Sequence, residues 1–288
     1  LFKPKDSYRT QGRSRSSLTQ GTNLPNGVIV HFNIKDFDQS KDTIQLHFKG
    51  KDGSVIKTFS TASDKDKLEI KVGGNQFVWN TRYKGAERLD GMILWGASLS
   101  GAKAVPGDYT VSLQKNKTVT EQVFTILPDP RAEASVADMQ KQFDFVNTVN
   151  QTIDEAHQAI KNIRSINAKL DAFKKNYGGL EEAKAILETA AALKKEFSEI
   201  EKTLYQTQNK SNQDPLNFPI RLTNKLGHIN NLVMSNDFPP TDQDVVVSRL
   251  LTSQIKEQVE RYNKLVKEDL ESFNQTFAAL KLDYLTLK

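Results

Sequence analysis

Two different periods of apolar residues divide the chain. Between residues 25 and 127 the apolar residues occur in short extended runs, and residues 43–48 alternate so that Ile44, Leu46 and Phe48 share one face. Turn signals such as Asp52-Gly53 separate the runs. Strands are predicted at 28–34, 43–48, 55–59, 68–72, 76–79, 108–113 and 119–126. Roughly seven short strands without a helical period predict an antiparallel β-sandwich of immunoglobulin or fibronectin type.

From residue 135 onward the apolar residues recur in steps of three and four. A capping box at Ser135 and Asp138 opens a predicted helix of about 40 residues, and Gly178-Gly179 ends it. Further helices are predicted at 180–206, at 219–234 and from 242 onward, the last again about 40 residues long. Because helices of this length are stable in water only when they pack together, we expect an antiparallel bundle of four long helices.

These patterns predict a two-domain β + α fold. The residues numbered 1–24 are polar, basic and without period, so we expect a linker or an arm, with Phe2 and Tyr8 as its anchors. The sandwich is expected at 25–128 and the helical bundle at 132–288.

Composition excludes several kinds of chemistry. The chain has no cysteine, which excludes disulfides, thiolate nucleophiles and cysteine-ligated zinc. None of its four histidines is accompanied by a serine elbow or a glycine-rich oxyanion turn, so we predict no catalytic residue, no cofactor and no enzymatic activity. The net charge is +5, but the lysines alternate with acids, which argues against nucleic-acid binding. No apolar run approaches the roughly 18 residues of a membrane span.

The long connection at 83–105 is the first candidate site. It carries four consecutive apolar residues, and apolar side chains on a loop have to be covered by something. We therefore predict a partner-binding site at Met92, Ile93, Leu94 and Trp95. Tyr83 and Trp95 are also candidates for contact with carbohydrate.

A second candidate is a weak calcium site at Asp36, Asp38 and Asp42. Acids at alternate positions are typical of the start of a calcium-binding loop. The sixth position is Lys41 instead of glycine, and the twelfth is His47 instead of glutamate. A solvated turn is the other interpretation, and we predict no metal centre.

Residues 77–86, 104–113 and 129–131 read FVWNTRYKGA, AVPGDYTVSL and DPR. With DPL at 214–216, LTNKL at 222–226 and DFPPT at 237–241, they resemble the C-terminal region of large secreted bacterial proteins with sortilin-like BNR/Asp-box β-propellers, often labelled glycosyl hydrolases. The predicted sandwich is similar to the immunoglobulin-like domain of flagellar hook-capping proteins. The propeller's Asp-box repeats do not occur in this sequence, so the resemblance implies that any hydrolytic or ligand-binding site of the parent lies on the propeller.

The resemblance leads to three functional hypotheses. The first is a non-catalytic C-terminal accessory module of an exported β-propeller protein, which docks or spaces the propeller of the same parent or binds another protein. The second is a carbohydrate- or cell-surface-binding module. The third is part of a glycoside hydrolase whose active site lies on the propeller. The chain starts at Leu1, so we expect a fragment of a longer protein, exported to the periplasm, the cell surface or the medium. Its oligomeric state stays open.

Overall fold

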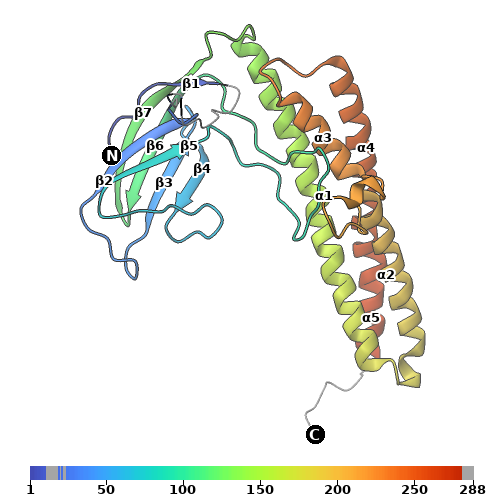
Figure 1. Cartoon of the computed structure of the whole chain (residues 1–288). Coiled ribbons are helices and arrows are strands. Elements are labelled where there is room, and N and C mark those ends of the chain that lie inside the picture. The colour runs from blue at the N-terminus through green and yellow to red at the C-terminus, as the bar shows by residue number, and fades with distance from the viewer. Residues whose placement is uncertain (11–18, 20, 22–23, 281–288) are drawn as a thin grey trace. The chain divides into compact units, whose positions relative to one another are not determined.

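The structure is a computed structural model that describes residues 1–10, 19, 21 and 24–280. The chain forms a β region followed by a helical region, as the two apolar periods predict (Figure 1). It divides into two compact units. The first unit takes the described residues of Leu1–Gly85 together with Ser100–Asn147 and Val233–Pro240, and the second takes Ala86–Leu99, Thr148–Leu232 and the described residues from Thr241 onward.

Five strands of the first unit form a mixed sheet in the order β1-β7-β6-β3-β4. Their bounds are β1 Ser7–Arg9, β3 Ile44–Lys49, β4 Val55–Ser60, β6 Gly107–Lys115 and β7 Thr118–Pro128. β1 is parallel to β7, and the other neighbouring strands are antiparallel. At the turn between β6 and β7, Asn116 adopts a φ of 53°, a left-handed conformation that asparagine tolerates better than most residues.

A separate two-stranded antiparallel sheet joins β2, Val28–Ile34, to β5, Gly73–Trp79. Alternate residues of β2 are buried, while His31 and Asn33 between them are exposed. This alternation is what a strand shows when one face is covered and the other meets solvent.

Both sheets contribute to one apolar core in the first unit. At its centre Trp79 is fully buried and stacks on Phe48, with 4.5 Å between the ring centroids. Phe124 meets both rings edge-to-face. The buried Trp79 indole donates its N–H to the carbonyl of Arg82 at 3.2 Å, so its one polar group is satisfied.

Residues 68–72 do not form the strand that their alternation predicts. Leu68 is buried in the core, but the backbone N–H and carbonyl of Lys71 are hydrogen-bonded to the side chain of Asn75. Asn75 accepts from the Lys71 N–H at 2.8 Å and donates to the Lys71 carbonyl at 2.7 Å. A side chain that bonds nearby backbone groups competes with strand pairing for them.

The N-terminal residues expected to form a linker or arm include the short strand β1. Of the expected anchors, Phe2 is 62% and Tyr8 50% exposed. Arg9 is buried instead, and its side chain helps to fix this segment to the rest of the first unit, together with the pairing of β1 with β7.

The Arg9 guanidinium joins segments that are far apart in the sequence. It donates to the carboxylate of Asp237 at 2.9 Å and to the side-chain oxygen of Gln142 at 2.8 Å. It also donates to the carbonyls of Lys103 and Ala104, each at 2.9 Å. All these groups belong to the first unit, so a single buried cation organises several of its backbone segments.

The predicted helices occur close to their expected bounds. They are α1 Val136–Tyr177, α2 Lys184–Leu204, α3 Leu222–Val233, α4 Asp242–Leu265 and α5 Glu271–Ala279. A π-helical turn, Val266–Leu270, joins α4 to α5. The expected capping box at Ser135 and Asp138 is present, and Thr241 with Asp244 forms a second one at the start of α4. No helix in the described part of the chain is long and apolar enough to span a membrane.

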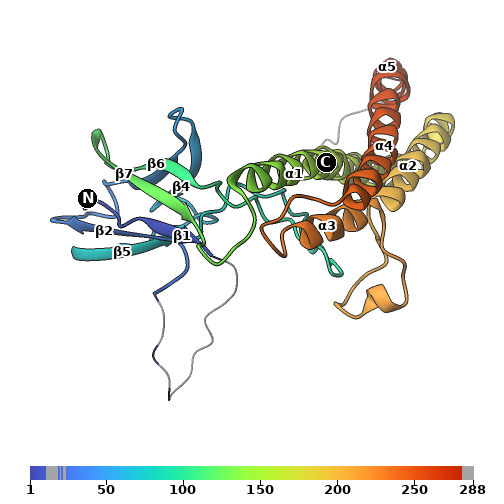
Figure 2. The same ribbon diagram turned by 90° about the horizontal axis from the view of Figure 1, so that it is seen from above.

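Within the second unit α2 runs beside α4 and α5 (Figure 2). Buried side chains include Ile160 from α1, Phe197 from α2 and Ile255 from α4. Polar contacts add to this packing: Arg164 of α1 pairs with Glu201 of α2 at 2.7 Å. The α1 helix itself is shared, because residues up to Asn147 belong to the first unit and those from Thr148 to the second.

Candidate functional site

The apolar part of the long connection lies in the second unit. The 86–99 loop is closed at its base by a hydrogen bond from the Ala86 N–H to the Leu99 carbonyl at 2.9 Å. In Figure 1 this blue-green loop reaches toward α3. Leu89 and Met92 are its buried anchors, at 2% and 4% exposure.

Asn224 of α3 binds both backbone polar groups of Trp95. Its side-chain oxygen accepts from the Trp95 N–H at 2.9 Å, and its amide nitrogen donates to the Trp95 carbonyl at 2.9 Å. Asn224 is only 5% exposed. Because a buried amide costs free energy unless it is paired, these two bonds fix the backbone at this point of the loop.

The next residue, Gly96, is held by the same helix. Its carbonyl accepts from His228 Nδ1 at 2.7 Å and from the Asn231 side chain at 3.3 Å. Gly96 has a φ of 60°, in the left-handed region that favours glycine. The loop also comes close to α3 at Gly227, whose carbonyl accepts from the Ser98 N–H at 2.9 Å.

The N-terminal half of the loop is fixed by residues of α1 and by Tyr205, which follows α2, all in the second unit. The hydroxyl of Tyr205 accepts from the Ile93 N–H at 3.0 Å, and Tyr205 is itself buried. His157 of α1 donates from Nδ1 to the Glu87 carbonyl at 2.6 Å, and burial lowers the pKa of this histidine. Lys161 pairs with the Glu87 carboxylate at 2.9 Å.

The four residues predicted to bind a partner therefore lie together but differ in exposure. Met92 is buried, Ile93 and Leu94 are half-buried, and Trp95 is 42% exposed. The helical residues of the same unit use the backbone of this loop for hydrogen bonding. The indole of Trp95 is left as the large apolar group that the loop presents to solvent.

Tyr83, the other residue predicted to contact carbohydrate, belongs to the first unit. Its ring is half-buried and packs edge-to-face on Phe143, with 4.7 Å between the centroids. Burial raises the pKa of its hydroxyl far above the ordinary value. The structure thus assigns Tyr83 and Trp95 to different units.

Two of the three acids of the calcium candidate lie beside the ammonium group of Lys115, and the third, Asp38, pairs with Lys41 at 3.2 Å. The Lys115 ammonium group pairs with Asp36, and it also lies 3.3 Å from the carboxylate of Asp42. Asp38 accepts hydrogen bonds from the hydroxyl and the N–H of Ser40, which lower the pKa of its carboxyl. Over residues 1–10, 19, 21 and 24–280, no group of three or more His, Cys, Asp or Glu side chains could hold a metal ion.

The residues that hold the 86–99 loop were not expected from the sequence. Asn224 and Tyr205 stand more than 100 positions from the loop, and their pairing with it is non-local. A polar side chain at a buried helix position would have been such a signal, because such a group needs a partner. Asn224 did not give it, because a position two residues from both Leu222 and Leu226 lies on the side of the helix opposite the predicted apolar face.

The chain was also compared with known proteins. Protein-family models, curated proteins and solved structures give no match to it.

Proposed function

We propose that this chain is a non-catalytic protein-interaction module that contacts its partner through the indole of Trp95. The observation that carries the proposal is the contrast between the backbone and the side chain of this residue. Asn224 bonds the backbone N–H and the carbonyl, whereas the residue as a whole is 42% exposed. An exposed tryptophan on a fixed backbone loses little conformational freedom on binding, and tryptophan is enriched among residues that dominate binding energy.

The polar groups around the loop support a structural role for this region. The buried side chains of Tyr205, Asn224 and His157 are each hydrogen-bonded to the main chain of the 86–99 loop. These hydrogen bonds fix the conformation of the 86–99 loop, and in this conformation the loop presents Trp95 to solvent. The partner is then a protein surface with an apolar pocket that accepts an indole.

We propose the finer architecture on similar grounds. The five-stranded and two-stranded sheets share one core, which favours a sandwich of immunoglobulin type. The packing of α2 on α4 and α5, together with the Arg164–Glu201 pair between α1 and α2, favours a helical bundle. The resemblance to the C-terminal region of exported β-propeller proteins suggests the partner, namely the propeller of the same parent.

Tryptophan fluorescence tests this function directly, because the chain has two tryptophans in opposite environments. Trp79 is fully buried and Trp95 is 42% exposed. On mixing the chain with a propeller of the resembling family, we expect the Trp95 emission to shift to the blue and its quenching by iodide to fall. Light scattering behind size exclusion gives the stoichiometry of the complex, and a dimer of this chain would identify a second copy as the partner.

A matched pair of variants locates the contact. Trp95→Ala should weaken binding by about 30-fold or more, the effect of losing roughly 2 kcal/mol at an interface. Leu250→Ala truncates another exposed apolar residue, 57% exposed on α4, and should leave the affinity unchanged. Equal affinity of the Trp95→Ala variant and the native chain would refute the proposal.

A further inference from the structure

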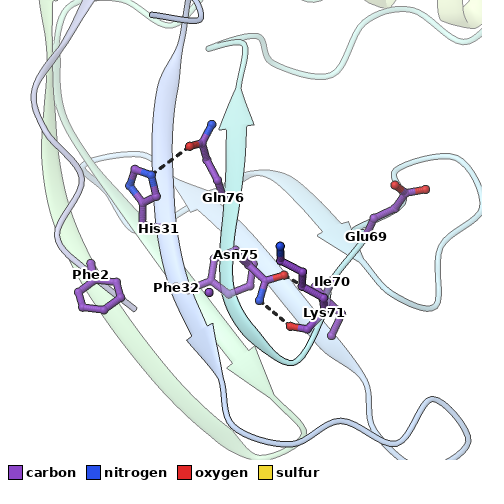
Figure 3. Close-up of a pocket in the computed structure, with 9 residues that line it drawn as sticks. Phe2, His31, Phe32, Glu69, Ile70, Lys71, Asn75 and Gln76 are labelled. Carbon is purple, nitrogen blue, oxygen red and sulfur yellow. Dashed lines mark hydrogen bonds between the residues drawn. The ribbon is translucent and has the colours of Figure 1, made fainter.

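A hollow lies on the first unit, separate from the Trp95 loop. It has a volume of about 730 Å³ and extends across β2 and β5. We call it the β2–β5 trough, and its lining includes Phe2, His31, Glu69, Lys71, Gly74 and Gln76. Figure 3 shows Phe2 on one side of β2 and residues 69–71 on the far side of β5, with His31 and Gln76 on the strands between them.

The strand register explains why the trough has a polar floor. His31 pairs with Gln76, and Asn33 with Gly74, in the two-stranded sheet. These positions alternate with the buried residues of β2, so they face solvent. At Gly74 a side chain is absent from this face, and an added Cβ would meet no atom within 4 Å.

The polar groups of the floor are fixed in position. His31 Nε2 and the Gln76 side-chain oxygen are hydrogen-bonded at 3.1 Å. In Figure 3 the amide nitrogen of Gln76 points away from His31, where it can donate to a ligand. The Phe2 N–H donates to the His31 carbonyl at 2.9 Å, which places the Phe2 ring beside the same floor.

The trough has no cluster of like charges. Glu69 and Lys71 stand two positions apart at its rim, and the Glu69 carboxylate also lies 4.0 Å from the ammonium group of Lys67. A charged ligand therefore finds no concentrated opposite charge here to replace its hydration. The trough therefore favours an uncharged ligand that offers both apolar C–H groups and hydroxyls.

We infer that the β2–β5 trough binds an uncharged saccharide. Phe2 is 62% exposed, and its ring offers a flat apolar surface for the C–H face of a sugar ring. The amide of Gln76 and the imidazole of His31 supply hydrogen bonds for its hydroxyls. This site shares no residue with the Trp95 loop, so the inference is independent of the proposed protein-interaction function.

The experiment screens the whole chain against an array of neutral and charged glycans, and the glycans that bind are then titrated by calorimetry. We expect binding of at least one neutral glycan, with a chemical-shift change at the backbone amide of Gln76. Binding of charged glycans alone, or of none, would overturn the inference.

Two variants probe the site from opposite directions. Phe2→Ala removes the ring, and Gly74→Leu fills the trough at a position with open space, so both should weaken binding by about tenfold or more. Val55→Ala, at an exposed position on β4, and Trp95→Ala should leave glycan binding unchanged. Glycan binding that survives Gly74→Leu but is lost in Trp95→Ala would move the sugar site to the loop and refute the trough.

Discussion

The guanidinium of Arg9 and the carboxylate of Asp237 lie 2.9 Å apart, and both side chains are more than nine-tenths buried. Removal of Arg9 leaves the carboxylate of Asp237 buried without the cation that bonds it at 2.9 Å, which is costly. We expect Arg9→Ala to lower the free energy of unfolding of the first unit by about 3–5 kcal/mol. Urea unfolding in a Trp95→Phe background measures this, because Trp79 in the β core is then the one remaining tryptophan.

The paired variant Arg9→Met with Asp237→Leu separates the effect of charge from that of hydrogen bonding. Without either charge, the first unit should recover part of the stability that Arg9→Ala loses. A double variant no more stable than Arg9→Ala would instead attribute the loss to the bonds with Gln142 and the carbonyls of Lys103 and Ala104.

Asn224→Leu tests how firmly the backbone of Trp95 is held. The substitution keeps the size of the side chain but removes both hydrogen bonds to Trp95, each of which contributes about 0.5–1.5 kcal/mol. We expect faster hydrogen exchange at the Trp95 amide and weaker partner binding. Asn231→Leu is the control, since Asn231 is exposed and makes one long bond to Gly96. Equal protection of the Trp95 amide in both variants would contradict this role of Asn224.

Gly27→Ala is expected to be severely destabilising. Gly27 has a φ of 129°, and an added Cβ would lie 2.2 Å from the carbonyl oxygen of Trp79. The strain alone is worth about 1–3 kcal/mol, and the clash with backbone adds to it. Gly74→Ala on β5 meets open space and should change stability by less than about 1 kcal/mol. Thermal unfolding followed by Trp79 emission compares the two.

The helical unit should lose stability in mild acid because of His157. This residue is fully buried, burial lowers its pKa from 6.5, and its Nε2 has no hydrogen-bond partner among the residues that the structure describes. The folded state therefore binds fewer protons than the unfolded state just below pH 6.5. Stability is fully present above about pH 6.5 and falls as the pH decreases below it. Urea unfolding followed by helical circular dichroism at several pH values measures the slope.

His157→Gln is the matched variant for this dependence. Glutamine can still donate to the Glu87 carbonyl, which His157 bonds at 2.6 Å, but it does not titrate. The free energy of unfolding of the helical unit should then decrease less steeply as the pH falls below 6.5. His47 also has a lowered pKa, but it lies on β3 in the first unit. His47→Gln should therefore leave the pH dependence of the stability of the helical unit unchanged. An unchanged slope in His157→Gln would assign the acid sensitivity to other groups.

The parts of the fold with a clear local pattern were predictable. The ends of α1 and α4 follow from capping residues, Ser135 and Thr241, whose partners stand three positions away. β1 was not predicted, because three residues paired in parallel with β7 carry no period of their own. Residues 68–72 show the opposite error. Apolar and polar residues alternate there as in a strand, but the Asn75 side chain is hydrogen-bonded to the backbone N–H and carbonyl of Lys71, which a strand would use for pairing.

The candidate site was predictable only in part. The apolar run at 92–95 can be recognised in the sequence, because apolar side chains in a predicted loop have to be buried against another part of the protein or a partner. Which of these four side chains are buried depends on contacts of the loop with α3 and with Tyr205. These contacts join residues far apart in the sequence, so the sequence around the loop does not indicate them. The Phe2 side of the trough was hidden for the same reason, because it depends on a hydrogen bond between residues 2 and 31.

The assignment of α1 to both units has a consequence for how the protein can be divided. The first unit needs its own stretch of α1 up to Asn147 and the turn Val233–Pro240, while the second needs the 86–99 loop. Each unit is therefore assembled from several separate stretches of chain, and no single cut yields two complete halves. A truncation at residue 131 would remove Gln142 and Asp237, both partners of the buried Arg9, from the β region. Expression of the β region alone should accordingly give a less stable protein than the same residues within the whole chain.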